Sequence, residues 1–254
     1  IYRVNEEGAF SNLVLNELLN KSNLDQRDKS LATQLIYGSI RQRNSIDWVI
    51  NHFSNRKVKK MTPWVRNALR LGVYQIDYLD KIPAPVAANE TVEVAKEYCN
   101  RGAVKFINGN LRNVAQNIDS VEYPDREEKP VQHIRHRYSF PQWIVQRWVK
   151  RYGTAQTIKI CQQLNKIPPT VIRTNTLQVT RKQLLENLRE EKAEAEVISI
   201  LDEAVNLMSY SSIPELDSFQ CGEFFVQGLS SMLVAPILNP IADDVVIDLC
   251  AAPG

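Results

Sequence analysis

The chain has 254 residues, carries 31 Lys and Arg against 29 Asp and Glu, and is 44% hydrophobic. This length predicts two domains of ordinary size, and this composition excludes general disorder. Only nine glycines and 8% aromatic residues argue against a turn-rich all-β fold. No apolar run approaches the ~20 residues of a spanning helix, and the N-terminus does not have the pattern of a signal peptide. We therefore expect a cytoplasmic protein with no membrane partner.

The cysteines and histidines do not predict a metal site. The four cysteines lie far apart in the sequence: Cys99, Cys161, Cys221 and Cys250. Zinc sites and disulfide frameworks need short spacings, so we expect neither, and Cys99, Cys161 and Cys221 are expected to be small buried hydrophobic residues. His133 and His136 have no third ligand at a familiar spacing, and the neighbouring Arg135 and Arg137 disfavour a cation. These histidines fit a basic stretch near RNA better.

Positive charge is concentrated in the first half of the chain. Residues 1–122 hold 17 Lys and Arg against 13 Asp and Glu, whereas residues 123–254 hold 14 against 16. The densest basic cluster consists of Arg41, Arg43, Arg56, Lys57, Lys59 and Lys60. Such a cluster suits a polyanion, with binding that ignores base sequence and weakens with salt. Solvated helix faces explain the charges equally well.

Apolar periodicity predicts helices throughout the first half. The expected helices cover residues 8–21, 25–38, 46–53, 62–76, 86–99 and 102–118. Asp25 and Thr62 are the expected N-caps, Pro63 occupies a favourable first position, and Gly38 and Gly102 mark an end and a start. No segment of strand periodicity interrupts this run. Residues 1–122 are therefore predicted to form an all-α domain.

The pattern changes after a polar, proline-containing stretch over residues 123–137, which has the composition of a linker. Beyond it, helices are expected around residues 143–149, 158–164, 180–191 and 230–238. Strands are expected over residues 170–173, 196–200 and 224–226. The β-branched run at residues 245–247 predicts a further strand, buried on both faces of a parallel sheet. The second half is thus expected to combine helices and strands.

The most specific motif is Asp248-Leu249-Cys250-Ala251-Ala252-Pro253-Gly254. Small residues after a buried strand allow close approach of a nucleotide-like ligand, although any tight turn has similar spacing. The wording Asp-x-Cys-Ala-Ala-Pro-Gly resembles motif I of the RNA cytosine-C5 methyltransferases related to RsmB, which use S-adenosylmethionine (SAM). The resemblance implies that Asp248, Cys250, Ala251, Ala252, Pro253 and Gly254 bind the cofactor. It also makes Cys250 a cofactor-loop residue rather than the nucleophile.

Other stretches resemble the same family. Tyr37-Gly38-x-x-Arg41-Gln42-Arg43, Arg66-x-x-Leu69-Arg70-Leu71-Gly72 and Phe106-Ile107-Asn108-x-x-Leu111-Arg112 resemble its NusB-like, RNA-binding helical domain. Arg173-Thr174-Asn175-Thr176-Leu177 resembles its RNA-recognition segment, so Arg173 and Asn175 become candidate RNA contacts; a structural role is equally compatible. Phe225-Val226-Gln227 followed by Ser230-Ser231 resembles the lead into motif I, although Gly228 stands where the family has an acid or amide.

The resemblance implies a multi-domain protein. It consists of an all-α NusB-like domain (1–122), a linker (123–137), an α+β RNA-recognition subdomain (138–228) and the first strand of a Rossmann-like α/β methyltransferase domain (229–254). The implied function is SAM-dependent methylation of a cytosine C5 in 16S ribosomal RNA by a monomer. Its cysteine nucleophile and its releasing cysteine are expected beyond Gly254, so this chain should be inactive. The alternatives are a non-catalytic NusB-like module in transcription or ribosome assembly, and a SAM enzyme acting on protein or a small molecule.

Overall fold

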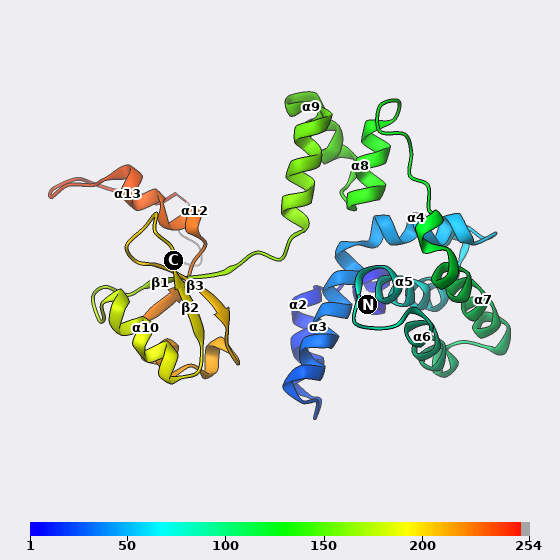
Figure 1. Ribbon diagram of the computed structural model, residues 1–254, viewed down its shortest axis with the longest axis horizontal. Helices are drawn as coiled ribbons and strands as arrows, with labels where there is room; N and C mark the ends of the chain where they lie inside the picture. The colour runs from blue at the N-terminus through cyan, green and yellow to red at the C-terminus, as the bar shows by residue number, and fades with distance from the viewer. Residues whose placement is uncertain (250–254) are drawn as a thin grey trace. The chain divides into compact units, whose positions relative to one another are not determined.

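The computed structural model describes residues 1–249 of the chain. It divides into two compact units, which we call unit 1 (residues 1–166) and unit 2 (residue 167 onward). Unit 1 is helical and unit 2 combines a sheet with helices (Figure 1). Over the described residues, no helix is long and apolar enough to cross a membrane.

The helices of unit 1 surround a single main core. They are α1 (Tyr2–Glu7), α2 (Ser11–Asn20), α3 (Gln26–Arg41), α4 (Arg43–Phe53), α5 (Pro63–Tyr78), α6 (Ala84–Tyr98), α7 (Arg101–Asn117), α8 (Pro130–Tyr138) and α9 (Gln142–Asn165), with short 3-10 helices η1 (Val58–Lys60) and η2 (Ile118–Ser120). The apolar stripes of α4, α5 and α7 meet in this core, where Ile46, Leu69 and Ile107 are completely buried. The helical nature predicted for this region is confirmed.

Some helix boundaries differ from the sequence-based expectation. Asp25 caps α3 as predicted, because its carboxylate accepts a hydrogen bond from the Asp28 amide at 2.8 Å. Thr62 makes no side-chain cap bond, although Pro63 does begin α5. Asn100, not Gly102, starts α7, because its side chain accepts a hydrogen bond from the Ala103 amide.

At its N-terminal end, unit 1 has two helices where one was expected. Gly8 adopts a left-handed conformation (φ 73°) that ends α1, and α2 then begins at Ser11. Phe10 and Leu13, which were expected on the buried stripe of a single helix, are exposed. The predicted continuous helix over residues 8–21 is therefore wrong in its first turn.

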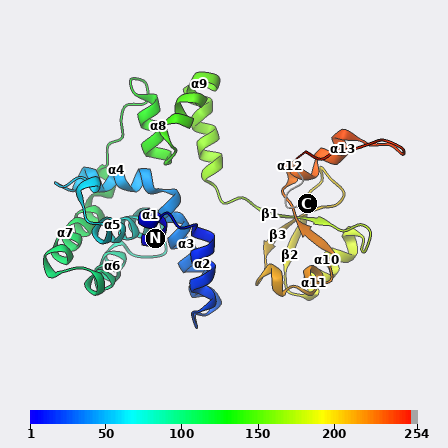
Figure 2. The same cartoon turned by 180° about the vertical axis from the view of Figure 1, so that it is seen from behind.

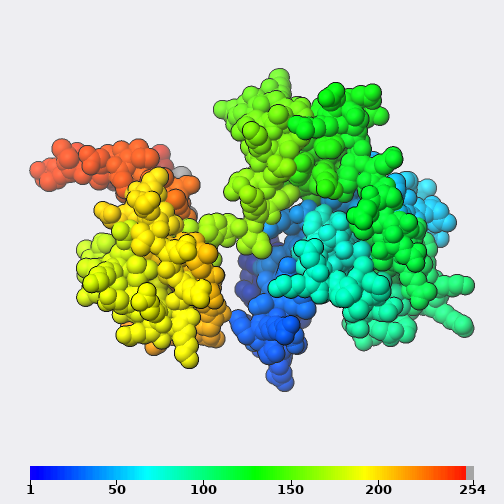
Figure 3. All heavy atoms as spheres, viewed as in Figure 1, coloured from blue at the N-terminus to red at the C-terminus, as the bar shows by residue number. Residues whose placement is uncertain are grey.

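The segment predicted to be a linker is helical in its second part. Helix α8 covers Pro130–Tyr138, and Ile134 is completely buried against Val145, Ile158 and Cys161 of α9. Helix α9 itself consists of two helical segments separated at Gly153 (φ 75°), as the two apolar stripes predicted. Helices α8 and α9 belong to the same compact unit as the preceding helices. Figure 3 shows the atoms of this unit as spheres. The polar composition of residues 123–137 gave no helical signal, because α8 depends on α9 for its burial.

Unit 2 contains a four-stranded antiparallel sheet in the order β2-β3-β1-β4. The strands are β1 (Thr170–Thr174), β2 (Glu194–Val197), β3 (Ala204–Ser209) and β4 (Phe224–Val226), and the helices are α10 (Arg181–Glu190), α11 (Asp217–Gln220), α12 (Leu229–Met232) and α13 (Val234–Leu238), with a 3-10 helix η3 (Ile213–Glu215). Leu184 and Leu188 of α10 pack on the sheet residues Ile172 and Val205. Figure 2 shows α10 beside the sheet. Thr180 caps α10 through a capping box with Gln183.

The strand predictions for unit 2 are confirmed in part. Strands β1 and β4 are as expected, β2 begins two residues earlier, and β3 was missed because its alternation of buried Val205 and Leu207 is short. The strand predicted at residues 245–247 is wrong. Val245 and Ile247 are exposed and pair with no strand of the described chain. A strand of a parallel sheet is stable only when neighbouring strands satisfy its backbone groups and cover its faces.

Candidate nucleic-acid interface

The six basic residues singled out from the first half all lie on the surface of unit 1. Arg41 ends α3, Arg43 begins α4, Arg56 and Lys57 follow α4, and Lys59 and Lys60 lie in η1. Each of these side chains is exposed. The local reason is the same at each place: these residues lie at helix ends or in a short connection, where no apolar neighbour covers them.

A polar cavity of about 460 Å³ in unit 1 brings only part of this cluster together. We call it the basic cavity. It is formed by α1, α4, η1, α5 and α8, and its charged residues are Glu6, Arg43, Asp47, Lys59, Arg66, Arg70 and Arg135. Of the predicted residues, Arg43 and Lys59 line it, whereas Arg41, Arg56, Lys57 and Lys60 do not.

Two arginines of the basic cavity are neutralised by carboxylates. Arg66 donates its Nε to Glu6 Oε1 at 2.8 Å and makes a second bond through Nη2. Arg70 binds both Asp47 oxygens, at 2.7 and 2.8 Å. The hydrogen bond from Arg66 holds the pKa of Glu6 down to about 2, even though burial opposes this shift. These two pairs tie α1 and α4 to α5 and leave no carboxylate over for other cations.

The other three cations of the basic cavity are not neutralised. Among the described residues, no ion pair involves Arg43, Lys59 or Arg135. Arg43 donates to Asn5 Oδ1 at 3.4 Å, and Arg135 donates to Gln142 Oε1 at 2.8 Å. Neutral amides hold these guanidinium groups in place without cancelling their charge.

Helix α8 contributes Arg135 and His136 to the cavity lining. The Nε atom of Arg135 and the Nδ1 atom of His136 are themselves covered by protein, with no hydrogen-bond partner found for them among the described residues. The His136 ring packs on Trp48 with ring centroids 4.3 Å apart. Burial, with a smaller contribution from the Arg135 charge, lowers the pKa of His136, and a hydrogen bond with the Asn44 backbone opposes this shift. His133 lies apart from this arrangement, because its Nδ1 is 2.8 Å from the Pro124 carbonyl oxygen.

The remaining predicted cations make local contacts. Arg56 places its guanidinium 5.6 Å from the centre of the Phe106 ring, and Lys57 donates to the Asn51 carbonyl at 3.5 Å. Both contacts leave the charge accessible to solvent. The cluster is therefore a basic surface of which only Arg43 and Lys59 belong to a concave feature.

Arg173 and Asn175 of unit 2 have different surroundings. Arg173 is exposed on β1, opposite Phe225 of β4, and donates to Gln227 Oε1 at 3.3 Å. Asn175 donates its side-chain amide to the Gly222 carbonyl at 2.8 Å, which closes the turn before β4. Arg173 is available to a ligand, whereas the amide of Asn175 already has a structural partner.

The residues expected to bind SAM are only partly described. Cys250, Ala251, Ala252, Pro253 and Gly254 lie outside the described residues. Asp248 is described, and its neighbours Val245, Ile247 and Leu249 are exposed and form no strand in the described residues. A SAM site needs walls built by strand ends and the helices that follow them. We therefore assign no step of methyl transfer to residues 245–249.

Two of the three described cysteines do not have the properties of nucleophiles. Burial raises the pKa of the Cys161 thiol to about 11 and also raises that of Cys99. Cys161 is buried as predicted, but Cys221 is exposed, so the prediction of a buried residue is wrong there. Cys221 follows α11 at the surface of unit 2, where no core residue covers it.

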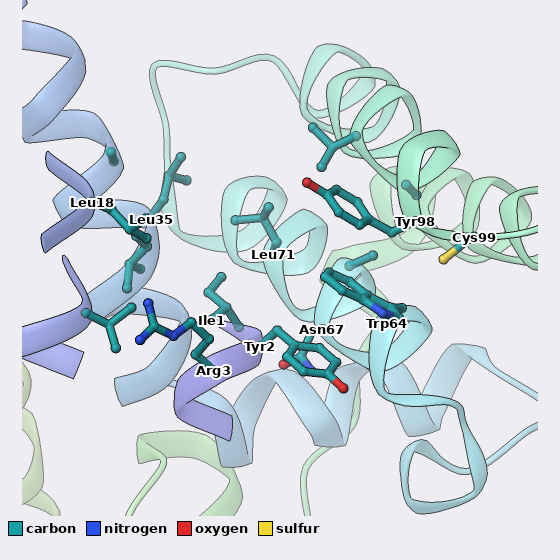
Figure 4. Close-up of a pocket in the computed structure, with 16 residues that line it drawn as sticks. Ile1, Tyr2, Arg3, Leu18, Leu35, Trp64, Asn67, Leu71, Tyr98 and Cys99 are labelled. Carbon is teal, nitrogen blue, oxygen red and sulfur yellow. The ribbon is translucent and has the colours of Figure 1, made fainter. Parts of the chain in front are cut away.

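Unit 1 also contains an apolar cavity of about 540 Å³ that the sequence did not indicate. Tyr2, Trp64 and Tyr98 stack along one wall, with ring centroids 4.5 and 4.4 Å apart (Figure 4). Leu18 and Leu35 contribute from α2 and α3. These residues come from helices far apart in the sequence, so no single periodic stripe could reveal the cavity.

Comparison with known proteins gives one family match in each half of the chain. The NusB family matches residues 1–116, and the ferredoxin-like domain of RsmF/B-like methyltransferases matches residues 140–214. The probable ribosomal RNA small subunit methyltransferase B of Bacillus subtilis (strain 168) is 36% identical over 100% of this chain and 56% of its own length. The chain is homologous to the RsmB methyltransferases along its whole length.

Further RsmB relatives match over a similar extent. A probable ribosomal RNA small subunit methyltransferase B of Synechocystis is 30% identical over 99% of this chain, and a Yersinia pseudotuberculosis methyltransferase B is 30% identical over 100%. The chain spans 56% and 57% of their respective lengths. The crystal structure of PH0851 has a TM-score of 0.64 over 94% of this chain and 53% of its own, at 18% identity, which supports the fold alone.

Proposed function

We propose that this chain is the RNA-recognising part of an RsmB-type methyltransferase that methylates C5 of a cytosine in 16S ribosomal RNA with SAM as methyl donor. The observation that supports this most strongly is the match, over the whole chain, to proteins named ribosomal RNA small subunit methyltransferase B. A NusB-type helical domain with an excess of positive charge agrees with an RNA partner.

In this proposal two parts of the chain bind different features of the RNA. Residues 1–122 attach to phosphates through the basic cluster, which supplies affinity without base specificity. Residues 138–228 form the recognition subdomain, in which Arg173 is exposed beside Phe225 on the sheet. Contacts from a sheet surface to unstacked bases are a common basis of specificity for single-stranded RNA. We further propose that residues 229–254 begin the SAM-dependent catalytic domain.

Binding to a 16S ribosomal RNA fragment over a salt series tests the attachment role. We expect charge reversal at Arg56, Lys57, Lys59 and Lys60 together to weaken binding to all RNAs alike. Each lost phosphate contact should flatten the log–log salt slope by ~0.7 for single-stranded RNA. An unchanged slope would show that this cluster is only a solvated surface.

A second variant tests the recognition role. Arg173→Gln should reduce the preference for 16S ribosomal RNA over an unrelated RNA of equal length, with a smaller effect on the salt slope. If the preference did not change, base reading would have to be assigned to other residues. A non-catalytic NusB-like module would show the salt-dependent binding but no such preference.

A further inference from the structure

We propose that the basic cavity of unit 1 holds a phosphodiester group of the bound RNA, through the cations of Lys59, Arg43 and Arg135, with His136 forming part of the cavity wall. This inference rests on the RNA binding proposed above and assigns it a defined pocket. It differs from a general basic surface because it selects Lys59 and excludes its neighbour Lys60. It also adds two residues of α8 that lie far from the basic cluster in the sequence.

The charge balance of the cavity favours an anion. Its two carboxylates, on Glu6 and Asp47, are already bound by Arg66 and Arg70. Three cations that form no ion pair with any described residue therefore line a hollow of about 460 Å³. Concave, partly desolvated surroundings strengthen the attraction between such cations and an anion beyond its value at an open surface.

Arg135 also supplies hydrogen-bond donors to the cavity. A guanidinium carries five N–H donors and no acceptor. Because Arg135 Nε is covered by protein, the donors that this residue offers to the cavity are those of its Nη groups, of which Nη1 also donates to Gln142. Phosphate oxygens supply several acceptors close together.

Two of the three cations are also held in position before a ligand arrives. Asn5 holds Arg43 and Gln142 holds Arg135, while the ring of Trp48 fixes the plane of His136. Little side-chain entropy is then lost on binding. Because Trp48 is covered by His136 on one side and donates its indole N–H to the Glu122 carbonyl at 3.0 Å, we assign to this cavity a backbone phosphate rather than a stacked base.

Two matched pairs of variants test this proposal in the 254-residue chain. Lys59→Gln and Lys60→Gln remove the same charge from adjacent, exposed positions of η1, but only Lys59 lines the cavity. Arg135→Gln and Arg137→Gln likewise remove one positive charge each from α8. Only Arg135 lines the cavity, whereas Arg137 packs on the Tyr123 ring. The probe is a fluorescently labelled single-stranded fragment of 16S ribosomal RNA, and its binding is measured by fluorescence anisotropy. The KCl concentration is varied over roughly 50–300 mM, because the affinity for phosphates changes strongly in this range.

We expect Lys59→Gln and Arg135→Gln each to flatten the salt slope by ~0.7, which corresponds to about a five-fold loss of affinity near 0.1 M salt. Lys60→Gln removes an equal charge of the basic cluster from outside the cavity and should flatten the slope less than Lys59→Gln, and Arg137→Gln should leave the slope unchanged. Thermal unfolding checks that each variant folds. The Lys59 pair keeps the test valid if Arg135→Gln does not fold, because Lys59 is exposed and forms no ion pair among the described residues.

Three results would overturn the proposal or its premise. Equal effects within each pair would refute the cavity but retain RNA binding to a diffuse basic surface. No salt-dependent binding by the unmodified chain would instead refute the proposed function itself. If inorganic phosphate, added at constant ionic strength, bound the cavity as tightly as the RNA does, the site would be one for free phosphate ions.

Discussion

Replacing Gly38 with alanine should destabilise unit 1, although alanine is the better helix former. Gly38 lies inside α3, and a Cβ atom there would be 2.0 Å from the Cζ and Oη atoms of Tyr74 in α5. Ordinary contacts begin at 3.4 Å, so the ring or the helix must shift by about 1.4 Å. Tyr74 is only 7% exposed and stacks on Tyr78, which leaves the ring little room to move.

The magnitude follows from comparison with Gly109→Ala. Gly109 lies inside α7, is exposed, and would place its Cβ in open space. Both substitutions gain ~1 kcal/mol of helix propensity, so the difference between the variants isolates the overpacking cost at Tyr74, about 1–3 kcal/mol. We expect Gly109→Ala to be stabilised and Gly38→Ala to be less stable than Gly109→Ala by that amount.

Urea unfolding followed by tryptophan fluorescence measures this difference in unit 1 alone. All four tryptophans lie in unit 1: Trp48, Trp64, Trp143 and Trp148. A difference of 2 kcal/mol corresponds to roughly 4–8 °C in melting temperature for a unit of this size. Equal stabilisation by the two substitutions would refute the close packing of α3 on α5 at Gly38.

Two further variants examine α8 and the Glu6 pair. Ile134→Ala removes a completely buried side chain from the contact of α8 with α9, and urea unfolding should show a loss of about 2–5 kcal/mol; a loss below 1 kcal/mol would mean that α8 is not packed as described. Glu6→Gln should lower stability at pH 7, because the depressed pKa of Glu6 contributes stability above its ordinary value near 4.5 that is lost as the pH falls towards about 2. The difference from the unmodified chain should therefore close over that pH range, and a difference independent of pH would contradict the ion pair with Arg66.

Periodicity alone determined the local structure of most of unit 1. The stripe containing Ile46, Val49 and Ile50 buries as predicted, because a helix places residues three and four apart on one face whatever it packs against. The Asp25 cap was equally readable, since it involves only residues within one turn of each other, and the helix expected from residue 180 begins there. Clustered charge likewise indicated Arg43 and Lys59 as candidate phosphate contacts.

Tertiary contacts decided the features that sequence reasoning missed. Gly38 was expected to end a helix, but α3 continues to Arg41, and the glycine is needed there because Tyr74 packs against it. The polar segment before Ile134 gave no helical signal, because α8 is stabilised by burial against α9 rather than by a stripe of its own. The same dependence on partners explains why residues 245–247, despite their β-branched composition, form no strand in the described chain.

The basic cavity shows the same division. Sequence alone determined that the first half of the chain is basic and suited to a polyanion, because charge is a property of composition. It could not determine which cations are neutralised, since Glu6 reaches Arg66 across 60 residues of sequence. Nor could the sequence alone show that Arg135 and Lys59 line the same cavity. That juxtaposition exists only because α8 packs against α4, which places one unpaired arginine and one buried imidazole at the edge of the same hollow.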